Sequence, residues 1–209
     1  MSTPLLALDL ETTGLGYDDA DPAKVKDDAI LEVAAVLVDS VTLDEIDEFG
    51  PFPISTSTPG LALMNDFVRN MHTTTGLIDR VQHPSARPLG TVDAELSKWM
   101  ASHGATERVH LLGSSVSLDA LFIRRHMPKT FARLHYRILD VSSFAVAMDG
   151  WDPKVAGQVQ EIVGDSTHEA MADIRRSLAI LRLYRQMFLS GARSGSLSLQ
   201  SVAGKAPQR

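Results

Sequence analysis

Residues 6–15 read LALDLETTGL, a short apolar run that contains two acids, Asp9 and Glu11. The apolar residues predict a buried strand over Leu5–Leu10, and residues i and i+2 of a strand point to the same face. Asp9 and Glu11 should therefore project together, although two like charges this close disfavour joint ionisation. A divalent cation resolves the conflict, and oxygen ligands suit Mg²⁺ or Mn²⁺. An acidic pair at a strand end is also common in solvated loops, so further ligands are needed.

The composition is that of one globular domain. The chain has 209 residues, of which 44% are hydrophobic, enough for one sizeable core. The absence of cysteine excludes disulfides, thiolate catalysis and cysteine–zinc sites. With no membrane-length apolar run and no export signal, we expect a cytoplasmic protein. The net charge of −6 argues against a long basic footprint on nucleic acid, although bound cations can invert the field of a carboxylate site.

The order of predicted elements favours an α/β domain with a mixed sheet. Two further strands, 29–41 and 44–56, follow without a crossover helix, so the first three strands should pair antiparallel. Pro51 and Pro53 place the third of them near an edge. Helical and strand patterns then alternate, as in an α/β domain, over 92–101, 109–113, 118–126, 137–141 and 167–189.

The last predicted helix, 167–189, is the clearest. Its apolar residues recur at helical spacing and form one stripe, made of Met171, Ile174, Leu178, Leu181, Tyr184 and Phe188. We expect a single domain over residues 1–189, with a polar loop over 16–28 and a disordered tail over 190–209.

Two more acids lie where they could join the first pair. Asp119 follows the strand 109–113 at the start of a helix, where an acid is also a common cap favoured by the helix dipole. Asp173 lies early in the last helix, where a solvent-exposed residue paired with Arg176 or Ser177 is the simpler interpretation.

The spacing of His168 and Asp173 constrains where the last helix starts. Five residues along a regular helix correspond to a rotation of about 140°. The two side chains therefore converge only if His168 lies before the first regular turn of the helix. Ser166 and Glu169 match a capping box, which predicts a helix start there. A histidine on such a loop beside carboxylates is a candidate general base. Four acids and one histidine together fit two-metal phosphoryl transfer.

Two motifs resemble the signatures of the DEDDh, or DnaQ-like, 3′→5′ exonucleases. They are DLETTGL at 9–15 and HEAMAD at 168–173. The resemblance implies a ribonuclease H-like fold, two Mg²⁺ or Mn²⁺ ions and stepwise release of 5′-nucleoside monophosphates. It also implies that His168 is the general base and that the metal ligands are Asp9, Glu11, Asp119 and Asp173.

A narrower resemblance, to the oligoribonucleases that cleave very short RNA, covers residues from about 5 to 188. It rests on LALMNDFVRNMHTTTGL (61–77), RRHMP (124–128) and HYRILDVSS (135–143). It implies a homodimer in which Tyr136 reaches the partner's site, with no role for a membrane. The implied substrate contacts are a base wedge of Leu15 and Phe67, a 5′-phosphate cap of Tyr136, Arg137, Ser142 and Ser143, and further contacts from Ser115 and His72.

The chain departs from the oligoribonuclease pattern in four places. Phe67 replaces a tryptophan, Leu118 a glutamine and Ser114 an asparagine, and the loop 16–28 is longer. None of these changes touches the five catalytic positions. We therefore expect an exonuclease acting on short RNA, with short DNA also open. A proofreading-type DNA exonuclease and a non-catalytic binding module on a nuclease scaffold remain the alternatives.

Overall fold

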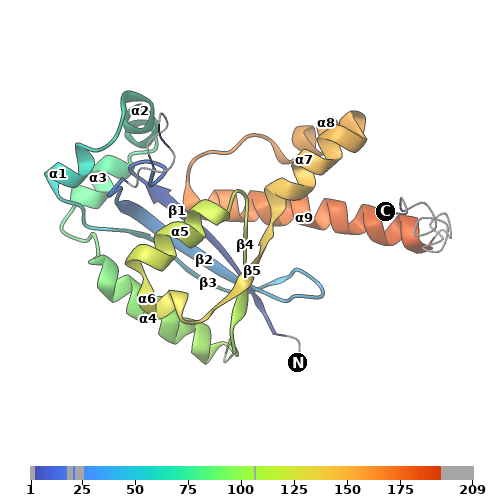
Figure 1. Ribbon diagram of the computed structural model, residues 1–209, viewed down its shortest axis with the longest axis horizontal. Helices are drawn as coiled ribbons and strands as arrows, with labels where there is room; N and C mark the ends of the chain where they lie inside the picture. Colours follow the sequence, from blue (N-terminus) through green and yellow to red (C-terminus); the bar gives the residue numbers. More distant parts are fainter. Residues whose placement is uncertain (1–2, 18–20, 22–25, 106, 194–209) are drawn as a thin grey trace.

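The structure is a computed structural model that describes residues 3–17, 21, 26–105 and 107–193 of the chain. Its centre is a sheet of five strands in the order β3-β2-β1-β4-β5 (Figure 1). Strands β1, β2 and β3 pair antiparallel, whereas β4 runs parallel to both β1 and β5. The strands are β1 (Leu5–Thr12), β2 (Ile30–Val38), β3 (Glu45–Pro53), β4 (Val109–Gly113) and β5 (Leu134–Asp140). The mixed sheet and its edge strand with Pro51 and Pro53 confirm the predicted α/β class.

Helices cover both faces of the sheet (Figure 1). One core cluster joins β1 and β2 to α4, α5 and the residues flanking α6, and a second joins the opposite face to α7, α8 and α9. All nine residues of β2 are buried, as expected of a strand covered on both sides. The helices are α1 (Thr58–Leu61), α2 (Asp66–Thr74), α3 (Leu77–Gln82), α4 (Leu89–Ser102), α5 (Ser117–His126), α6 (Pro128–Phe131), α7 (Val141–Trp151), α8 (Pro153–Val163) and α9 (Ala170–Arg193). Within the described ranges, no helix is both long and apolar enough to cross a membrane.

The alternation of side chains along β1 decides where its acids point. Leu6, Leu8 and Leu10 belong to the core beneath α4 and α5, while Leu5 and Ala7 belong to the core beneath α9. Asp9 and Glu11 continue the second series. Their carboxylates therefore lie on the sheet face that α9 covers, at the carboxyl end of the strand.

The last helix differs from its predicted bounds at both ends. It begins at Ala170 rather than at residue 167, because His168 has a left-handed φ of +55° that a helix cannot contain. The capping box is wrong, since Ser166 Oγ donates to Asp173. The helix continues past residue 189 to Arg193, and residues 194–209 of the predicted tail lie outside the described residues, as do 18–20 and 22–25 of the predicted loop. Phe188 is 45% exposed, whereas the other five residues of the predicted stripe are buried.

Helices α1 to α3 form a separate small layer that the sequence pattern did not locate. Leu61, Met64, Leu77 and Val81 pack there against Leu31 of β2. Helix α2 is capped by the side chain of Asn65, which accepts a hydrogen bond from the Val68 amide at 2.9 Å. This layer carries Phe67 and His72 to the end of the sheet where the acids lie.

Candidate active site

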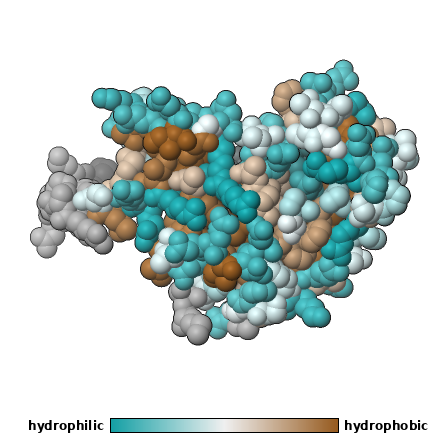
Figure 2. Space-filling view, turned by 180° about the vertical axis from the view of Figure 1, so that it is seen from behind, coloured by the Kyte–Doolittle hydropathy of each residue, from teal (hydrophilic) through white to brown (hydrophobic). Residues whose placement is uncertain are grey.

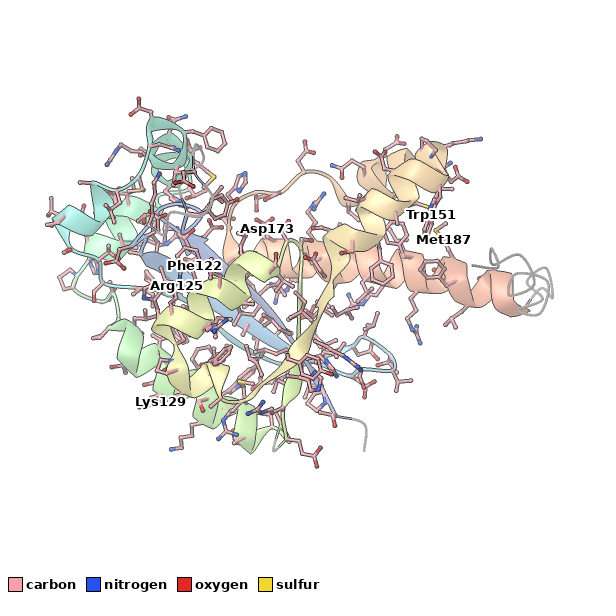
Figure 3. The ribbon with its side chains drawn as sticks, in the orientation of Figure 1. Phe122, Arg125, Lys129, Trp151, Asp173 and Met187 are labelled. Atoms are coloured by element: carbon pink, nitrogen blue, oxygen red, sulfur yellow. The ribbon has the colours of Figure 1, made fainter. Side chains whose placement is uncertain are left out.

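Three acids from two elements meet at the carboxyl end of β1. Asp9, Glu11 and Asp173 each offer an oxygen atom, and these atoms all lie within 4.8 Å of one another. The shared face predicted for Asp9 and Glu11 is confirmed, and α9 brings Asp173 to it from a distant part of the chain (Figure 3). Oxygen ligands at this spacing form a donor set that suits Mg²⁺ or Mn²⁺.

The fourth acid, Asp119, lies in the first turn of α5 and is not one of the three acids whose oxygen atoms lie within 4.8 Å of one another. Its side chain is buried, and Oδ1 accepts a hydrogen bond from the Leu10 amide at 2.9 Å. This contact ties the start of α5 to the residue between Asp9 and Glu11. Burial raises the pKa of Asp119 well above its ordinary value, and the neighbouring charge of Asp9 raises it further.

Proximity and burial make these carboxyl groups poor acids in the metal-free protein. Burial raises the pKa of Asp9 to about 7, and the charges of Asp173 and Glu32 add to the effect. Burial raises the pKa of Glu11 to about 8, with Asp9, Asp173 and Glu32 raising it further and Arg80 opposing them. Asp9 and Glu11 therefore hold protons near neutral pH. A bound divalent cation would favour the ionised carboxylates and release those protons.

His168 lies in the turn that precedes α9, directly against Asp173. Its backbone amide donates to Asp173 Oδ2 at 3.1 Å, and the Thr167 amide donates to Oδ1 at 3.2 Å. Ser166 Oγ also donates to Oδ2, at 2.7 Å. The two residues converge because His168 stands outside the helix, as their spacing predicted, and the exposed imidazole belongs to the same cavity as Glu11.

That cavity has a volume of about 360 Å³ and joins the two predicted wedge residues. Leu15 and Phe67 line it with His168 and Glu11, although Leu15 follows β1 and Phe67 comes from α2. Leu15 is 42% exposed and Phe67 is 74% exposed, so both apolar side chains have surface free to contact a ligand. Two residues from the ends of the predicted loop, Tyr17 and Lys26, line the same cavity.

His72 does not reach that cavity. Its ring is completely buried, and Nε2 lies 2.9 Å from the Thr12 carbonyl oxygen, to which it donates. Nδ1 faces Glu11 Oε2 at 3.9 Å and has no hydrogen-bond partner within the described part of the chain. Burial lowers the pKa of His72, which keeps the ring neutral. The structure thus places this predicted substrate contact behind Glu11, as a support.

The predicted phosphate-cap residues occupy two places: Ser115, Ser142 and Ser143 follow the carboxyl ends of β4 and β5, whereas Tyr136 and Arg137 lie earlier in β5, opposite His110. The Ser115 amide donates to Ser142 Oγ at 2.8 Å and to Asp140 Oδ1 at 3.0 Å. Tyr136 and Arg137 are exposed on β5, with the guanidinium carbon 5.4 Å from the tyrosine ring centre.

The strand that carries these two side chains is irregular at this point. Val109 pairs with Leu134, but Leu111 pairs with Ile138, so the HYR segment forms a bulge at the sheet edge. Beyond the strand, Ser143 is exposed in the first turn of α7.

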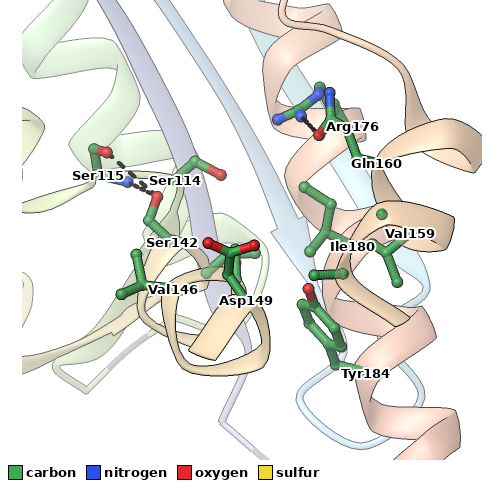
Figure 4. Close-up of a pocket in the computed structure, with 14 residues that line it drawn as sticks. Ser114, Ser115, Ser142, Val146, Asp149, Val159, Gln160, Arg176, Ile180 and Tyr184 are labelled. Carbon is green, nitrogen blue, oxygen red and sulfur yellow. Dashed lines mark hydrogen bonds between the residues drawn. The ribbon is translucent and has the colours of Figure 1, made fainter. Parts of the chain in front are cut away.

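A second cavity, of about 640 Å³, extends from this cluster (Figure 4). Ser114, Ser115 and Ser142 lie on one side of it, and Gln160 and Arg176 lie on the other. Arg176 donates to Gln160 Oε1 at 2.9 Å and to the Gly164 carbonyl, and so does not pair with Asp173. The simpler interpretation of Asp173 as half of a surface ion pair with Arg176 is therefore wrong.

Sequence reasoning missed an ion pair beneath the site. Glu32 is 2% exposed and pairs in register with Glu11, and Arg80 Nη2 contacts Glu32 Oε1 at 2.9 Å. A charged residue inside an apolar strand was the signal for Asp9 and Glu11, and Glu32 carries the same signal within 29–41. Nothing comparable marks Arg80, whose partner is distant in sequence.

Comparison with known proteins identifies a broad family and a narrower group within it. Residues 6–181 match the exonuclease (RNase_T) family. The oligoribonuclease of Tropheryma whipplei is 35% identical over 187 residues, which cover 90% of this chain and 94% of that protein. The oligoribonuclease of Aromatoleum aromaticum is 36% identical over 187 residues, 88% of this chain and 94% of that protein.

Solved structures share the fold at low identity. Cell-death related nuclease 4 (CRN-4) superimposes with a TM-score of 0.62 at 19% identity, over 88% of this chain and 64% of that one. The nuclease domain of 3′hExo, a DEDDh family member bound to rAMP, superimposes with a TM-score of 0.55 at 16% identity. The match covers 88% of this chain and 92% of that one. With its acids, its histidine and its sheet arranged in this way, the chain belongs to the exonuclease family and, within that family, to the oligoribonucleases.

Proposed function

We propose that the protein is a 3′→5′ exoribonuclease that cleaves short oligonucleotides and releases 5′-nucleoside monophosphates. One observation carries the proposal: Glu11, which clusters with Asp9 and Asp173, lines one cavity together with His168, Leu15 and Phe67. The oligoribonucleases of Tropheryma whipplei and Aromatoleum aromaticum match this chain over nearly their whole length.

The residues fit a site for two divalent cations, Mg²⁺ or Mn²⁺. Asp9, Glu11 and Asp173 would hold them, with Asp119 completing the set from α5. When bound, the cations would neutralise the carboxylates and the scissile phosphate and make an attacking water easier to deprotonate. His168 would accept that proton on its imidazole, which Asp173 keeps at the cavity by holding the turn. Leu15 and Phe67 would flank the terminal base, since an exposed aromatic ring stacks on any base.

The length preference would come from Arg137 of β5 and from the turns that follow β4 and β5. Arg137, Ser142 and Ser143 would bind the 5′-phosphate, with Ser115 holding Ser142 in place. Arginine suits this role because its planar fork binds phosphate through two hydrogen bonds. A cap that occupies the 5′ end leaves room for only a few nucleotides.

We also propose a homodimer and a cytoplasmic location. Tyr136 is 77% exposed at the sheet edge, where a partner's site would take it up. Exposed apolar side chains extend over α7 and α9, among them Trp151 and Met187, both labelled in Figure 3, and hydrophobic residues are visible on this part of the surface (Figure 2). Sedimentation velocity of the wild type and of Tyr136→Ala at several concentrations tests the dimer separately from the activity of its sites.

Substrate length is the decisive test of function. Initial rates are compared on a 5′-labelled diribonucleotide, the corresponding dimer of 2′-deoxyribonucleotides and a DNA primer of about twenty nucleotides, so that substrate preference is measured as a ratio of rates. Faster turnover of the diribonucleotide supports the proposal. Faster cleavage of the DNA primer would instead identify a proofreading-type enzyme. If no substrate were cleaved in the presence of Mn²⁺, the protein would be a non-catalytic binding module.

A further inference from the structure

The segment that carries Leu15 is anchored to one buried carboxylate, Asp28. This side chain comes from the residues just before β2 and is 4% exposed. Its Oδ2 accepts a hydrogen bond from the Gly16 amide at 2.9 Å, and its Oδ1 accepts one from Thr13 Oγ1 at 3.2 Å. The two oxygens therefore bind the residues on either side of the Gly14–Leu15 pair.

Thr13 and Gly14 add further constraints at the start of the segment that carries Leu15. Thr13 forms two more bonds to Ala29, one from its amide to the carbonyl oxygen at 2.9 Å and one from the Ala29 amide to Oγ1 at 2.8 Å. A Cβ atom on Gly14 would lie 2.7 Å from Asp28 Oδ2, closer than real side chains approach. Only glycine lets the backbone pass over the carboxylate at this distance.

The far end of the segment is held from the opposite side. Arg125 Nη1 of α5 donates to the Gly16 carbonyl oxygen at 3.0 Å, and Gly16 has a left-handed φ of +76°. Both polar groups of the Gly16 backbone are thus bonded, the amide by Asp28 and the carbonyl by Arg125. Leu15 lies between these anchors with an exposed side chain, and both Leu15 and Asp28 line the 360 Å³ cavity.

We propose that Asp28 is a positioning residue that sets how far Leu15 enters the substrate cavity, and so determines the affinity for a dinucleotide. The inference rests on the proposed function, because it takes Leu15 to be a base contact. Asp28 would act through geometry: two acceptor oxygens at a fixed separation hold two donors at a fixed separation. Its charge works in the opposite direction, since a carboxylate beside the cavity repels a phosphodiester.

Loss of positioning should raise the dinucleotide KM of an Asp28 variant, whereas loss of the negative charge should lower it. The direction of the change in KM therefore separates the two effects. Asp28→Ala and Asp28→Asn are compared with wild type on a 5′-phosphorylated dinucleotide and on bis(4-nitrophenyl) phosphate, a diester with no base. We expect Asp28→Ala to raise KM for the dinucleotide at least tenfold, about the loss of one buried leucine contact, with kcat within about threefold of wild type. Hydrolysis of the nitrophenyl diester and the Kd for Mn²⁺ by calorimetry should not change. Asp28→Asn keeps one oxygen acceptor and should show a smaller KM increase.

Asp27→Ala is the matched control, because it removes the same charge from an exposed neighbour. Its KM should stay at the wild-type value or fall slightly. A double-mutant cycle then separates positioning from a general loss of folding: in a Leu15→Ala background, Asp28→Asn should add little to KM, because the wedge it positions is already gone.

Three outcomes would overturn the inference. They are an unchanged dinucleotide KM in Asp28→Ala, an equal loss on both substrates, or additive effects of Asp28→Asn and Leu15→Ala. Failure of the proposed function looks different, because the wild-type protein itself would then cleave the long DNA primer faster than the dinucleotide, or would cleave no substrate at all.

Discussion

The backbone amide of His168 donates to Asp173 Oδ2 at 3.1 Å, so the candidate general base and a candidate metal ligand form one structural unit. The same carboxylate also accepts from Ser166 Oγ and from the Thr167 amide. As a metal ligand, Asp173 would therefore have two roles that use different lone pairs, one toward the cations and one toward the turn. Any change at Asp173 should affect both the metal affinity and the place of the imidazole.

His168→Ala should lower kcat by about 10²–10⁴-fold, the usual contribution of a positioned general base. KM for the dinucleotide and the Kd for Mn²⁺ should stay near wild type, because the turn is held through the backbone amide and not through the ring. Steady-state kinetics with calorimetry measures both. His83→Ala is the control, since His83 is exposed and bonds only locally to Ser85. A His168→Ala variant with wild-type kcat would exclude this residue as the base.

Divalent metal should stabilise the protein more at alkaline pH than at acid pH. The folded-state pKa values of Asp9 and Glu11, about 7 and about 8, lie above the ordinary values of 3.8 and 4.5. A raised folded-state pKa gives stability that is complete below about pH 4 and is lost as the pH rises through 7 to 8. Bound cations remove this loss by pairing the ionised carboxylates.

Melting temperatures measured with EDTA or with Mg²⁺ between pH 5.5 and 8.5 test this pH dependence. The increase caused by Mg²⁺ should grow with pH in the wild type and should be much smaller in Asp9→Asn. The same Mg²⁺-induced increase at every pH would contradict the assignment of Asp9 and Glu11 as the responsible groups.

Arg80→Ala should destabilise the protein by leaving Glu32 without its cation. The Glu32 side chain is 3% exposed, but that of Arg80 is 40% exposed. Removing one partner of a buried pair costs about 3–5 kcal/mol, and solvent screening of Arg80 reduces this to roughly 1–3 kcal/mol. Urea unfolding at pH 8 measures the loss. Adding Glu32→Gln to Arg80→Ala should recover part of it, and a double variant no more stable than the single one would show that the pair is not responsible.

His72→Ala should weaken metal binding without removing any ligand. The substitution leaves the Thr12 carbonyl oxygen without its donor and opens a space beside Glu11, at a cost of about 1–3 kcal/mol in unfolding free energy. The Kd for Mn²⁺ should rise several-fold as the end of β1 loses its support. His72→Gln, which can still donate to Thr12, is the conservative variant and should retain most of the affinity. Equal Mn²⁺ affinity in wild type and His72→Ala would leave the ring with a packing role alone.

Phe67→Ala should affect substrate binding and leave stability unchanged, because the ring is 74% exposed. KM for the dinucleotide should rise about 5- to 100-fold, the equivalent of one lost base stack. Phe67→Trp offers a larger ring and should lower KM below the wild-type value. Thermal melting supplies the control, and a KM unchanged in Phe67→Ala would place the base elsewhere.

Much of the fold could be predicted from local pattern. The apolar runs predicted all five strands, and the lack of a crossover helix predicted that the first three pair antiparallel. Helices α1 to α3 could not be placed in this way, because they are short and bury only part of their surface against Leu31 and its neighbours. The start of α9 was also missed, since the left-handed φ of His168 depends on Asp173 and not on local propensity.

The sequence by itself determined which groups are the candidates for the chemistry: Asp9 and Glu11 share a face because a strand repeats every two residues. Only the tertiary structure decided which groups support them. Asp119 binds the Leu10 amide, Arg80 neutralises Glu32, and Asp28 holds the residues around Leu15, each across a large separation along the chain or between elements. Such contacts follow from how the sheet and helices pack, and packing brings together residues whose spacing along the chain has no period.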